Sequence, residues 1–210
     1  MTTFLVPAGS GEGEFTEKRS RFIGHVWRVE SEAEAGERIR ETREIHRDAT
    51  HNVYAYIIRE GNIVRFSDDG EPGGTSGMPT LNVFSSEKIE NVCCVVTRYF
   101  GGTLLGAGGL VRAYSKAAKL ALDAAGVAQM AQWLSFKISF DYSFFERAKR
   151  ILDEFEALTT SSDFGTEVSL EALVREDRAL ELERNFREAS AGKALWLGLG
   201  SEFRAGPRQK

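Results

Sequence analysis

Residues Val92–Gly109 read V-C-C-V-V-T-R-Y-F-G-G-T-L-L-G-A-G-G. The stretch opens with an apolar, β-branched run that has the length and composition of a buried strand. Arg98, Tyr99 and Phe100 follow, then five glycines, and a helical pattern begins at Leu110. A strand that ends in a cation and aromatics and is followed by glycines and a helix start is typical of a ligand site in α/β proteins.

The helix expected after the glycines runs to about Ala125 and ends at Gly126, a residue typical of helix C-termini. Its periodicity predicts one face of small and apolar residues, packed on a sheet, and an opposite basic face. The buried face comprises Leu110, Tyr114, Ala117, Ala121 and Ala125, and the basic face comprises Arg112, Lys116 and Lys119.

The chain has 210 residues and a formal net charge of −4, which argues against a uniformly basic nucleic-acid binder. A local basic patch stays possible, because Val92 to Leu122 contains no acidic residue. No apolar stretch approaches the roughly 18 residues needed to span a membrane, and the first residues lack a secretory signal. We therefore expect a soluble, cytoplasmic protein.

The only two cysteines, Cys93 and Cys94, are adjacent in the expected strand. Neighbours in a strand point to opposite faces, and no other cysteine exists to pair with either. They are interpreted as reduced core residues, as expected in the cytoplasm.

Two domains and a tail are expected, at residues 1–130, 131–204 and 205–210. In the first, alternating residues predict strands within 4–7 and 14–29, and strands at 51–58 and 63–66 joined by a turn. Ser31 and Glu34 form a capping box before a helix that runs to about Arg47. In the second, Ser143 and Glu146 form another capping box, and the order β-α-β-β-α-β predicts a ferredoxin-like fold.

The glycines match neither standard nucleotide template. A P-loop needs Lys and Ser or Thr where Ala107 and Gly108 stand, and a dinucleotide fingerprint needs glycine where Val111 stands. Glycine-rich backbone before a helix can still expose N–H groups to an anion, and an aromatic beside a cation suits base stacking. The predicted nucleic-acid or anion-binding residues are Arg98, Tyr99, Gly101, Gly102, Gly106, Gly108, Arg112, Lys116 and Lys119.

A packing role explains the same residues equally well. Tyr99 and Phe100 would then belong to the core, and the glycines would permit a tight turn and close helix packing. The sequence leaves both interpretations open.

The acidic loop at residues 67–79 offers an alternative chemistry. Asp68, Asp69 and Glu71 could hold a divalent cation, although their spacing does not match the calcium loop. Aspartates that cap backbone N–H groups in a solvated turn are the more common arrangement. His51 could be a general base, but no nucleophile is visibly paired with it. We therefore expect no catalytic residue, resident metal or cofactor.

Several long motifs resemble the IMPACT/YigZ family. They are R-F-S-D-D-G-E-P at 65–72, G-T-S-G at 74–77, V-V-T-R-Y-F-G-G at 95–102 and L-G-A-G-G-L-V-R-A-Y at 105–114, and residues 20–24 and 48–52 fit earlier blocks of the family. The resemblance covers residues 4–126, and the second unit is similar to the C-terminal domain of bacterial members.

The resemblance implies a mixed α/β (α+β) fold: an N-terminal domain similar to domain 2 of ribosomal protein S5, then a ferredoxin-like domain as in elongation factor G. Those two domains of elongation factor G contact the ribosome. Eukaryotic relatives regulate translation by interfering with activation of a kinase that phosphorylates an initiation factor, and they carry a different additional domain. The resemblance therefore implies translation control through RNA, the ribosome or a protein partner.

The resulting hypothesis is a translation regulator that binds RNA or a ribosomal surface through the basic glycine-rich region. One alternative is a hydrolase-type or metal-dependent enzyme that uses the Asp68, Asp69 and Glu71 loop. Another is a protein-interaction module whose ferredoxin-like sheet pairs with a partner or a second copy. The oligomeric state is left open by the sequence.

Overall fold

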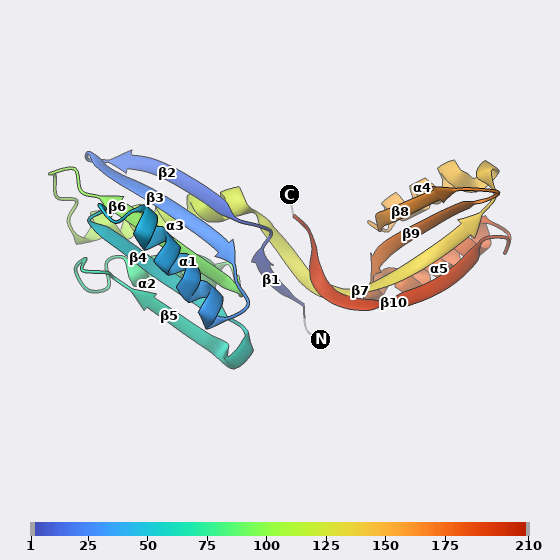
Figure 1. The fold of residues 1–210 in the computed structure, drawn as a ribbon, viewed down its shortest axis with the longest axis horizontal. Coiled ribbons are helices and arrows are strands. Elements are labelled where there is room, and N and C mark those ends of the chain that lie inside the picture. Colours follow the sequence, from blue (N-terminus) through green and yellow to red (C-terminus); the bar gives the residue numbers. More distant parts are fainter. Residues whose placement is uncertain (1–2, 209–210) are drawn as a thin grey trace. The chain divides into compact units, whose positions relative to one another are not determined.

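The computed structural model describes residues 3–208. An N-terminal unit comprises Phe4–Gln129 and residues 205–208, and a C-terminal unit comprises Met130–Arg204. Each unit combines helices with a mainly antiparallel sheet, as Figure 1 shows, and the predicted α+β class is confirmed.

The N-terminal unit is built on a five-stranded sheet with the order β2-β3-β6-β4-β5, in which all neighbours are antiparallel. The central strand β6 is the stretch that begins at Val92. Strand β1 pairs instead with β7, which begins at Val127. In chain order the elements are β1 (Phe4–Pro7), β2 (Gly11–Glu17), β3 (Ser20–Arg28), α1 (Glu32–Ile45), β4 (His51–Ile58), the short 3-10 helix η1 (Glu60–Asn62), β5 (Ile63–Ser67), α2 (Gly77–Ser86), β6 (Val92–Tyr99) and α3 (Ala107–Ala125).

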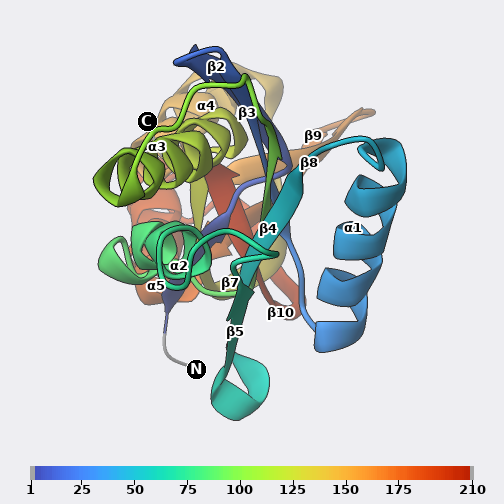
Figure 2. The same ribbon diagram turned by 90° about the vertical axis from the view of Figure 1, so that its left-hand side faces the viewer.

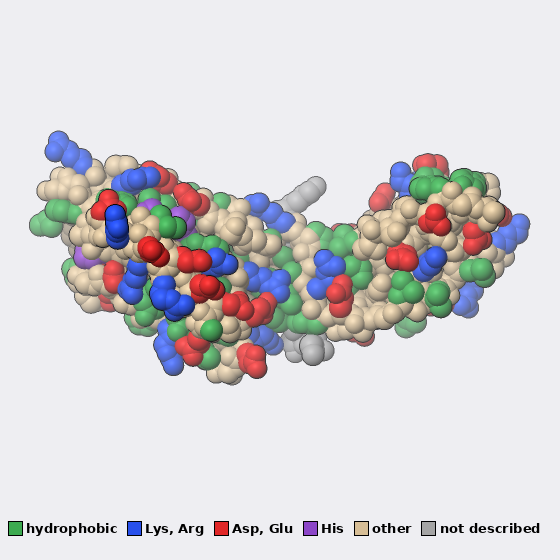
Figure 3. Space-filling view, in the orientation of Figure 1, with side chains coloured by type: hydrophobic (Ala, Val, Ile, Leu, Met, Phe, Trp, Pro, Cys, Tyr) green, Lys and Arg blue, Asp and Glu red, His purple; other side chains and the backbone are tan. Residues whose placement is uncertain are grey.

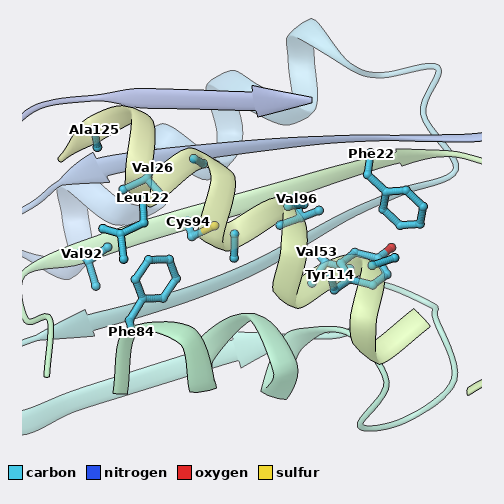
Figure 4. Close-up of a cluster of buried hydrophobic side chains, with 14 of the residues drawn as sticks. Phe22, Val26, Val53, Phe84, Val92, Cys94, Val96, Tyr114, Leu122 and Ala125 are labelled. Carbon is cyan, nitrogen blue, oxygen red and sulfur yellow. The ribbon is translucent and has the colours of Figure 1, made fainter. Parts of the chain in front are cut away.

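Helices cover both faces of this sheet. Figure 2 shows α1 on one side of the strands and α2 with α3 on the other. Alternation along β6 explains the two layers: Cys94 packs toward α3 (Figure 4), whereas Cys93 packs with Ala35 and Ile39 of α1. Burial raises the pKa of the Cys93 thiol to about 12 and that of Cys94 well above its ordinary value. Both cysteines are free and buried, as the sequence predicted.

The helix boundaries follow from local chemistry. Ser31 Oγ accepts a hydrogen bond from Glu34 N at 3.2 Å, which confirms the predicted N-cap of α1. Helix α3 begins at Ala107, three residues earlier than predicted, because Gly108 and Gly109 continue the helix instead of preceding it. Its predicted apolar face is buried against the sheet.

The C-terminal unit has the strand order β10-β7-β9-β8, with β9 antiparallel to both β7 and β8. Its element order confirms the predicted ferredoxin-like arrangement. The elements are β7 (Val127–Phe140), the 3-10 helix η2 (Tyr142–Phe144), α4 (Phe145–Glu154), β8 (Leu158–Phe164), β9 (Val168–Arg175), α5 (Glu176–Ala189) and β10 (Leu195–Arg208).

Two expectations for this part of the chain are wrong. The predicted Ser143–Glu146 capping box does not form, because the 3-10 turn places Phe144 at the N-cap of α4 without a side-chain hydrogen bond. The predicted tail at 205–210 continues β10 as far as Arg208, whose guanidinium donates to the carbonyls of Asp123 and Ala124 at the end of α3. Residues 209–210 lie outside the described part of the chain.

Candidate functional site

The residues singled out in the sequence gather at one end of the N-terminal sheet. Strand β6 ends there, and β3 and β4 begin there, so that Arg98 lies opposite Phe22 on one side and His51 on the other. The loop at 68–76 leads from β5 into α2, and the loop at 100–106 leads from β6 into α3. Antiparallel register thus brings together segments far apart in the sequence.

A buried ion pair lies at the centre of this end. Arg98 is only 5% exposed, and its Nη1 lies 2.6 Å from Glu71 Oε1. The same carboxylate oxygen accepts a hydrogen bond from the Tyr114 hydroxyl of α3 at 2.7 Å. Burial and this hydrogen bond raise the pKa of Tyr114 far above its ordinary value, so the phenol stays protonated. The pair therefore connects β6, the acidic loop and α3.

The rest of the Arg98 guanidinium is held by a hydroxyl and two aromatic rings. Its Nη2 donates to Ser20 Oγ at 3.2 Å, and its carbon lies 5.4 Å and 5.3 Å from the ring centroids of Phe22 and Phe100. Its Nε has no hydrogen-bond partner. Arg98 was expected among the phosphate contacts, but this geometry places it inside the fold, where it positions the surrounding loops.

Asp68 and Asp69 of the acidic loop, like Glu71, each accept hydrogen bonds from different partners. Asp68 accepts from the backbone N–H groups of Gly74, Ser76 and Gly77 at 2.8–3.1 Å. Burial opposes ionisation of Asp68, but these hydrogen bonds outweigh it and lower the pKa of the carboxyl below its ordinary value. Asp69 accepts from Arg43 Nη2 at 2.7 Å and from the backbone N–H of Asn52 at 2.6 Å. The loop thus has the capping role that the sequence also allowed.

The residues named for the metal and enzyme alternatives are hydrogen-bonded or ion-paired within the fold. Within residues 3–208, no group of three His, Cys, Asp or Glu side chains is arranged to hold a metal ion. His51 Nε2 does approach Glu71 to 3.8 Å, but its Nδ1 lies 2.7 Å from the carbonyl oxygen of Asp69. The imidazole of His51, the one candidate general base named from the sequence, is therefore held through Nδ1 by a backbone carbonyl.

The glycines divide into two kinds. A Cβ at Gly101 would lie 2.0 Å from the backbone of Arg19, so this glycine allows the loop to pack on the β2–β3 turn. Gly106 has φ +74°, a conformation that favours glycine, and a Cβ there would meet nothing within 4 Å. Gly102 is similar, and a Cβ at Gly108 would meet only the Arg112 guanidinium, at 3.6 Å. The packing interpretation therefore holds for Gly101, whereas backbone is open to solvent near the other three.

Helix α3 begins without a side-chain cap and without an acidic residue in its first turn. The first N–H groups of such a helix lack partners within the helix. Exposed apolar side chains flank this start: Leu104 is 81% exposed and Phe100 is 44% exposed. The α1 face, seen in Figure 3, instead carries acidic and basic side chains together.

A groove runs beside this helix start. It has a volume of about 250 Å³ and lies between the β2–β3 hairpin and α3. The Lys116 ammonium lies 4.3 Å from the centroid of the Phe15 ring on its wall. Glu17 is the one acidic residue of the lining, which comprises Phe15, Glu17, Lys18, Leu105, Gly109, Arg112, Ala113 and Lys116.

Of the predicted binding residues, Arg112 and Lys116 line this groove, whereas Lys119 and Tyr99, like the buried Arg98, do not. Lys119 Nζ is held by Glu87 at 2.7 Å and by Asp123 at 2.9 Å, which raises its pKa and neutralises its charge locally. Tyr99 is partly buried on the α1 face, where its hydroxyl lies 2.9 Å from His46 Nδ1. Burial and Asp48 raise the pKa of that hydroxyl.

Lys18 and Arg19 were not singled out from the sequence. They form the exposed β2–β3 turn, both with positive φ, and the backbone of Arg19 packs against Gly101 of the glycine loop. Two alternating strands flanking a Lys-Arg pair could have indicated a basic hairpin tip. Its position beside α3 depends on tertiary packing and carries no local signal.

Comparisons with known proteins follow the same division of the chain. Residues 18–122 match the model of the Impact N-terminal domain, and residues 138–193 match a domain of unknown function (DUF1949). The IMPACT family member YvyE of Bacillus subtilis is 38% identical over 195 residues, which cover 92% of this chain and 90% of the relative. YigZ of Escherichia coli is 27% identical over 95% of this chain and 99% of its own.

More distant relatives match a shorter part. The IMPACT homologue of Dictyostelium discoideum is 38% identical over 97 residues, covering 43% of this chain and 27% of its own. A crystal structure described as that of a hypothetical protein aligns with a TM-score of 0.59, 27% identity and coverage of 95% of this chain and 98% of its own. No helix within residues 3–208 is long and apolar enough to cross a membrane. Together the family models and the nearly full-length relatives show that this chain belongs to the IMPACT family.

Proposed function

We propose that this protein binds single-stranded RNA, presented on a ribosomal surface, and thereby influences translation in the cytoplasm. The observation that carries the proposal is the basic groove beside the uncapped start of α3. There Lys18, Arg112 and Lys116 surround an aromatic wall. The role in translation rests on the resemblance of the chain to its family.

Single-stranded RNA fits the chemistry of this surface. Lysine and arginine beside a groove attract phosphates, and free helix N–H groups favour an anion. The exposed ring of Phe100 offers a face on which an unpaired base can stack, and stacking tolerates any base. We therefore assign phosphate contacts to Arg112, Lys116 and the β2–β3 turn, and base stacking to Phe100.

The residues predicted from the sequence have different roles in this proposal. Gly102, Gly106 and Gly108 leave backbone open for close approach. Arg98 and Gly101 hold the loop in place from inside, and Tyr99 supports it from the α1 face. Lys119 contributes least, because two carboxylates already hold it.

Salt dependence of binding tests the proposal. Affinity for a labelled single-stranded RNA is measured by fluorescence anisotropy at increasing salt, for the wild type and Lys116→Ala. Loss of one phosphate contact flattens the slope of log K against log salt by about 0.7–1. Lys193→Ala, an equal charge change on an exposed residue of the C-terminal unit, is expected to leave the slope unchanged.

Cosedimentation with ribosomal subunits tests the site of action. The wild type is expected to pellet with subunits at low salt, and Lys116→Ala and Arg112→Ala are expected to stay in the supernatant. Absence of RNA binding at low salt, or equal slopes for Lys116→Ala and Lys193→Ala, would remove the proposal.

A further inference from the structure

Strand β10 forms an edge of the C-terminal sheet. Among the described strands it pairs only with β7, so from Leu195 to Ser201 its other side presents backbone N–H and C=O groups to solvent. The opposite edge of the sheet is β8. Edge strands are sites at which a second chain can add to a sheet.

The two edges differ in how they discourage such pairing. Strand β8 has a register shift between Thr159 and Ser161 and carries Asp163. Bulges and charges are the usual protection of an edge. From Leu195 to Ser201, β10 has neither a charged residue nor a proline. The β10 edge is therefore the one left open to pairing.

Exposed leucines line β10 at alternate positions. Leu195, Leu197 and Leu199 are 67%, 59% and 47% exposed. Alternate residues of a strand share a face, so the three form one apolar row. The intervening Trp196 points the other way and stacks on Phe136, with ring centroids 4.0 Å apart. Exposure of such an apolar row to water is unfavourable, and contact with another apolar surface would lower the free energy.

The spacing of the leucines is compatible with two-fold symmetric pairing of two copies of the strand. The leucine positions of L-W-L-G-L are symmetric about Leu197. When two copies of β10 pair antiparallel about that residue, Leu197 faces Leu197 of the second copy, and Leu195 faces its Leu199. Any other register that keeps the leucines on one face matches fewer of them. The uncharged stretch adds no repulsion between the two copies.

A hollow on the helix side fits the same register. It measures about 340 Å³ and is lined by residues of β7, α5 and β10, including Phe136, Ala179 and Trp196. Gly198 also lines it, and a Cβ there would meet nothing within 4 Å. In antiparallel pairing about Leu197, Trp196 of the second copy lies opposite Gly198. The hollow beside Gly198 leaves room for its indole ring.

We propose that β10 is a self-association edge, through which two copies of this chain form one continuous sheet centred on Leu197. The two-fold symmetry of the leucine positions and the hollow beside Gly198 favour a second copy over an unrelated peptide. Contacts of this size give weak, concentration-dependent association. The proposal is independent of RNA binding, which is assigned to the N-terminal unit.

Sedimentation velocity of the full chain over a wide concentration range tests the proposal. The wild type is expected to move from monomer to dimer as concentration rises. Leu197→Lys places two ammonium groups face to face on the axis and is expected to raise the dissociation constant at least about tenfold. Ile45→Lys, at another exposed apolar residue outside the C-terminal unit, is expected to leave it unchanged. A wild type that stays monomeric at every concentration overturns the proposal.

Charge exchange tests the register. Leu195→Lys and Leu199→Glu are each expected to weaken the dimer. The double variant is expected to restore it, because the lysine introduced in each copy then faces the glutamate introduced in the other. Within one strand the two positions are about 13 Å apart and cannot pair. Circular dichroism confirms that each variant folds. A double variant no tighter than the weaker single variant contradicts the register.

Discussion

Two loops lead into helices at the same end of the N-terminal sheet, and they treat the helix start in opposite ways. The loop at 68–76 supplies its own anion, because the Asp68 carboxylate accepts three backbone N–H groups around the start of α2. The loop at 100–106 supplies none, and α3 begins at Ala107 after an N-cap residue, Gly106, that makes no side-chain hydrogen bond. The backbone N–H groups at the start of α2 therefore have a partner within the protein, whereas those at the start of α3 face solvent.

This difference between the two loops indicates that the first stabilises the fold and that the second is available to a ligand. In the first loop Glu71 also pairs with Arg98, so its acidic residues are committed to structure. In the second the exposed groups are glycine backbone, apolar side chains and nearby cations. The acidic residues of the first loop therefore act in helix capping and in a buried ion pair.

The largest expected effect comes from breaking the buried pair. Glu71→Ala leaves the Arg98 guanidinium buried without its counter-ion and is expected to lower the free energy of unfolding by about 3–5 kcal/mol. Urea denaturation measures the change, and Glu71→Gln gives a milder variant if the alanine variant does not fold.

The matched control is Glu41→Ala, which breaks an exposed pair with Arg38 on α1. Its expected cost is under about 1 kcal/mol. Equal costs at Glu71 and Glu41 would mean that the buried pair does not hold the two loops together.

An intermediate effect is expected at the satisfied helix start. Asp68→Asn weakens three backbone hydrogen bonds and is expected to cost about 1–2 kcal/mol at neutral pH. The pKa of Asp68 is lower in the folded state than in the unfolded state, so the unfolded state binds more protons as pH falls.

The contribution of Asp68 is therefore present above about pH 4 and is lost as pH falls through its lower folded pKa. Thermal unfolding between pH 6 and 2 is expected to bring the wild type and Asp68→Asn together at acid pH. A stability difference that is constant across this range would show that ionised Asp68 does not cap α2.

The smallest expected effect on stability comes from giving α3 the acid that it lacks. Gly108→Asp adds a carboxylate to the first turn, near Arg112, and is expected to raise stability by about 0.5 kcal/mol. It should nevertheless weaken RNA binding, because the carboxylate competes with phosphate for the same groups. Gly108→Asn, which is uncharged and of similar size, is the control in the anisotropy measurement. Equal RNA affinities for the two variants would show that the start of α3 does not contact the RNA.

Much of the fold could be predicted because its signals are local. The alternation in β6, the Ser31 cap and the period of α3 each act within a few residues. The Ser143 cap failed because a 3-10 turn competes with the helix start. The strand after residue 204 was missed because its glycine and proline argue against a strand, whereas Arg208 is fixed by hydrogen bonds to distant carbonyls.

The candidate site was predictable in place but not in detail. The period of α3 predicted that Arg112 and Lys116 share a face, and both side chains are exposed in the structure. Burial of Arg98 depends on Glu71 and Ser20, which are 27 and 78 residues away in sequence, and the hold on Lys119 depends on Glu87. Such pairings appear only when tertiary packing brings the segments together.

The buried cysteines have a practical consequence for measuring this protein. Cys93 and Cys94 lie on opposite faces of β6, and their thiols stay protonated at neutral pH. Maleimide reagents need an accessible thiolate, so neither native thiol is a target in the folded state. A single cysteine introduced on the surface, for example at Leu104 or Leu197, can therefore carry a spectroscopic label without removal of either native cysteine.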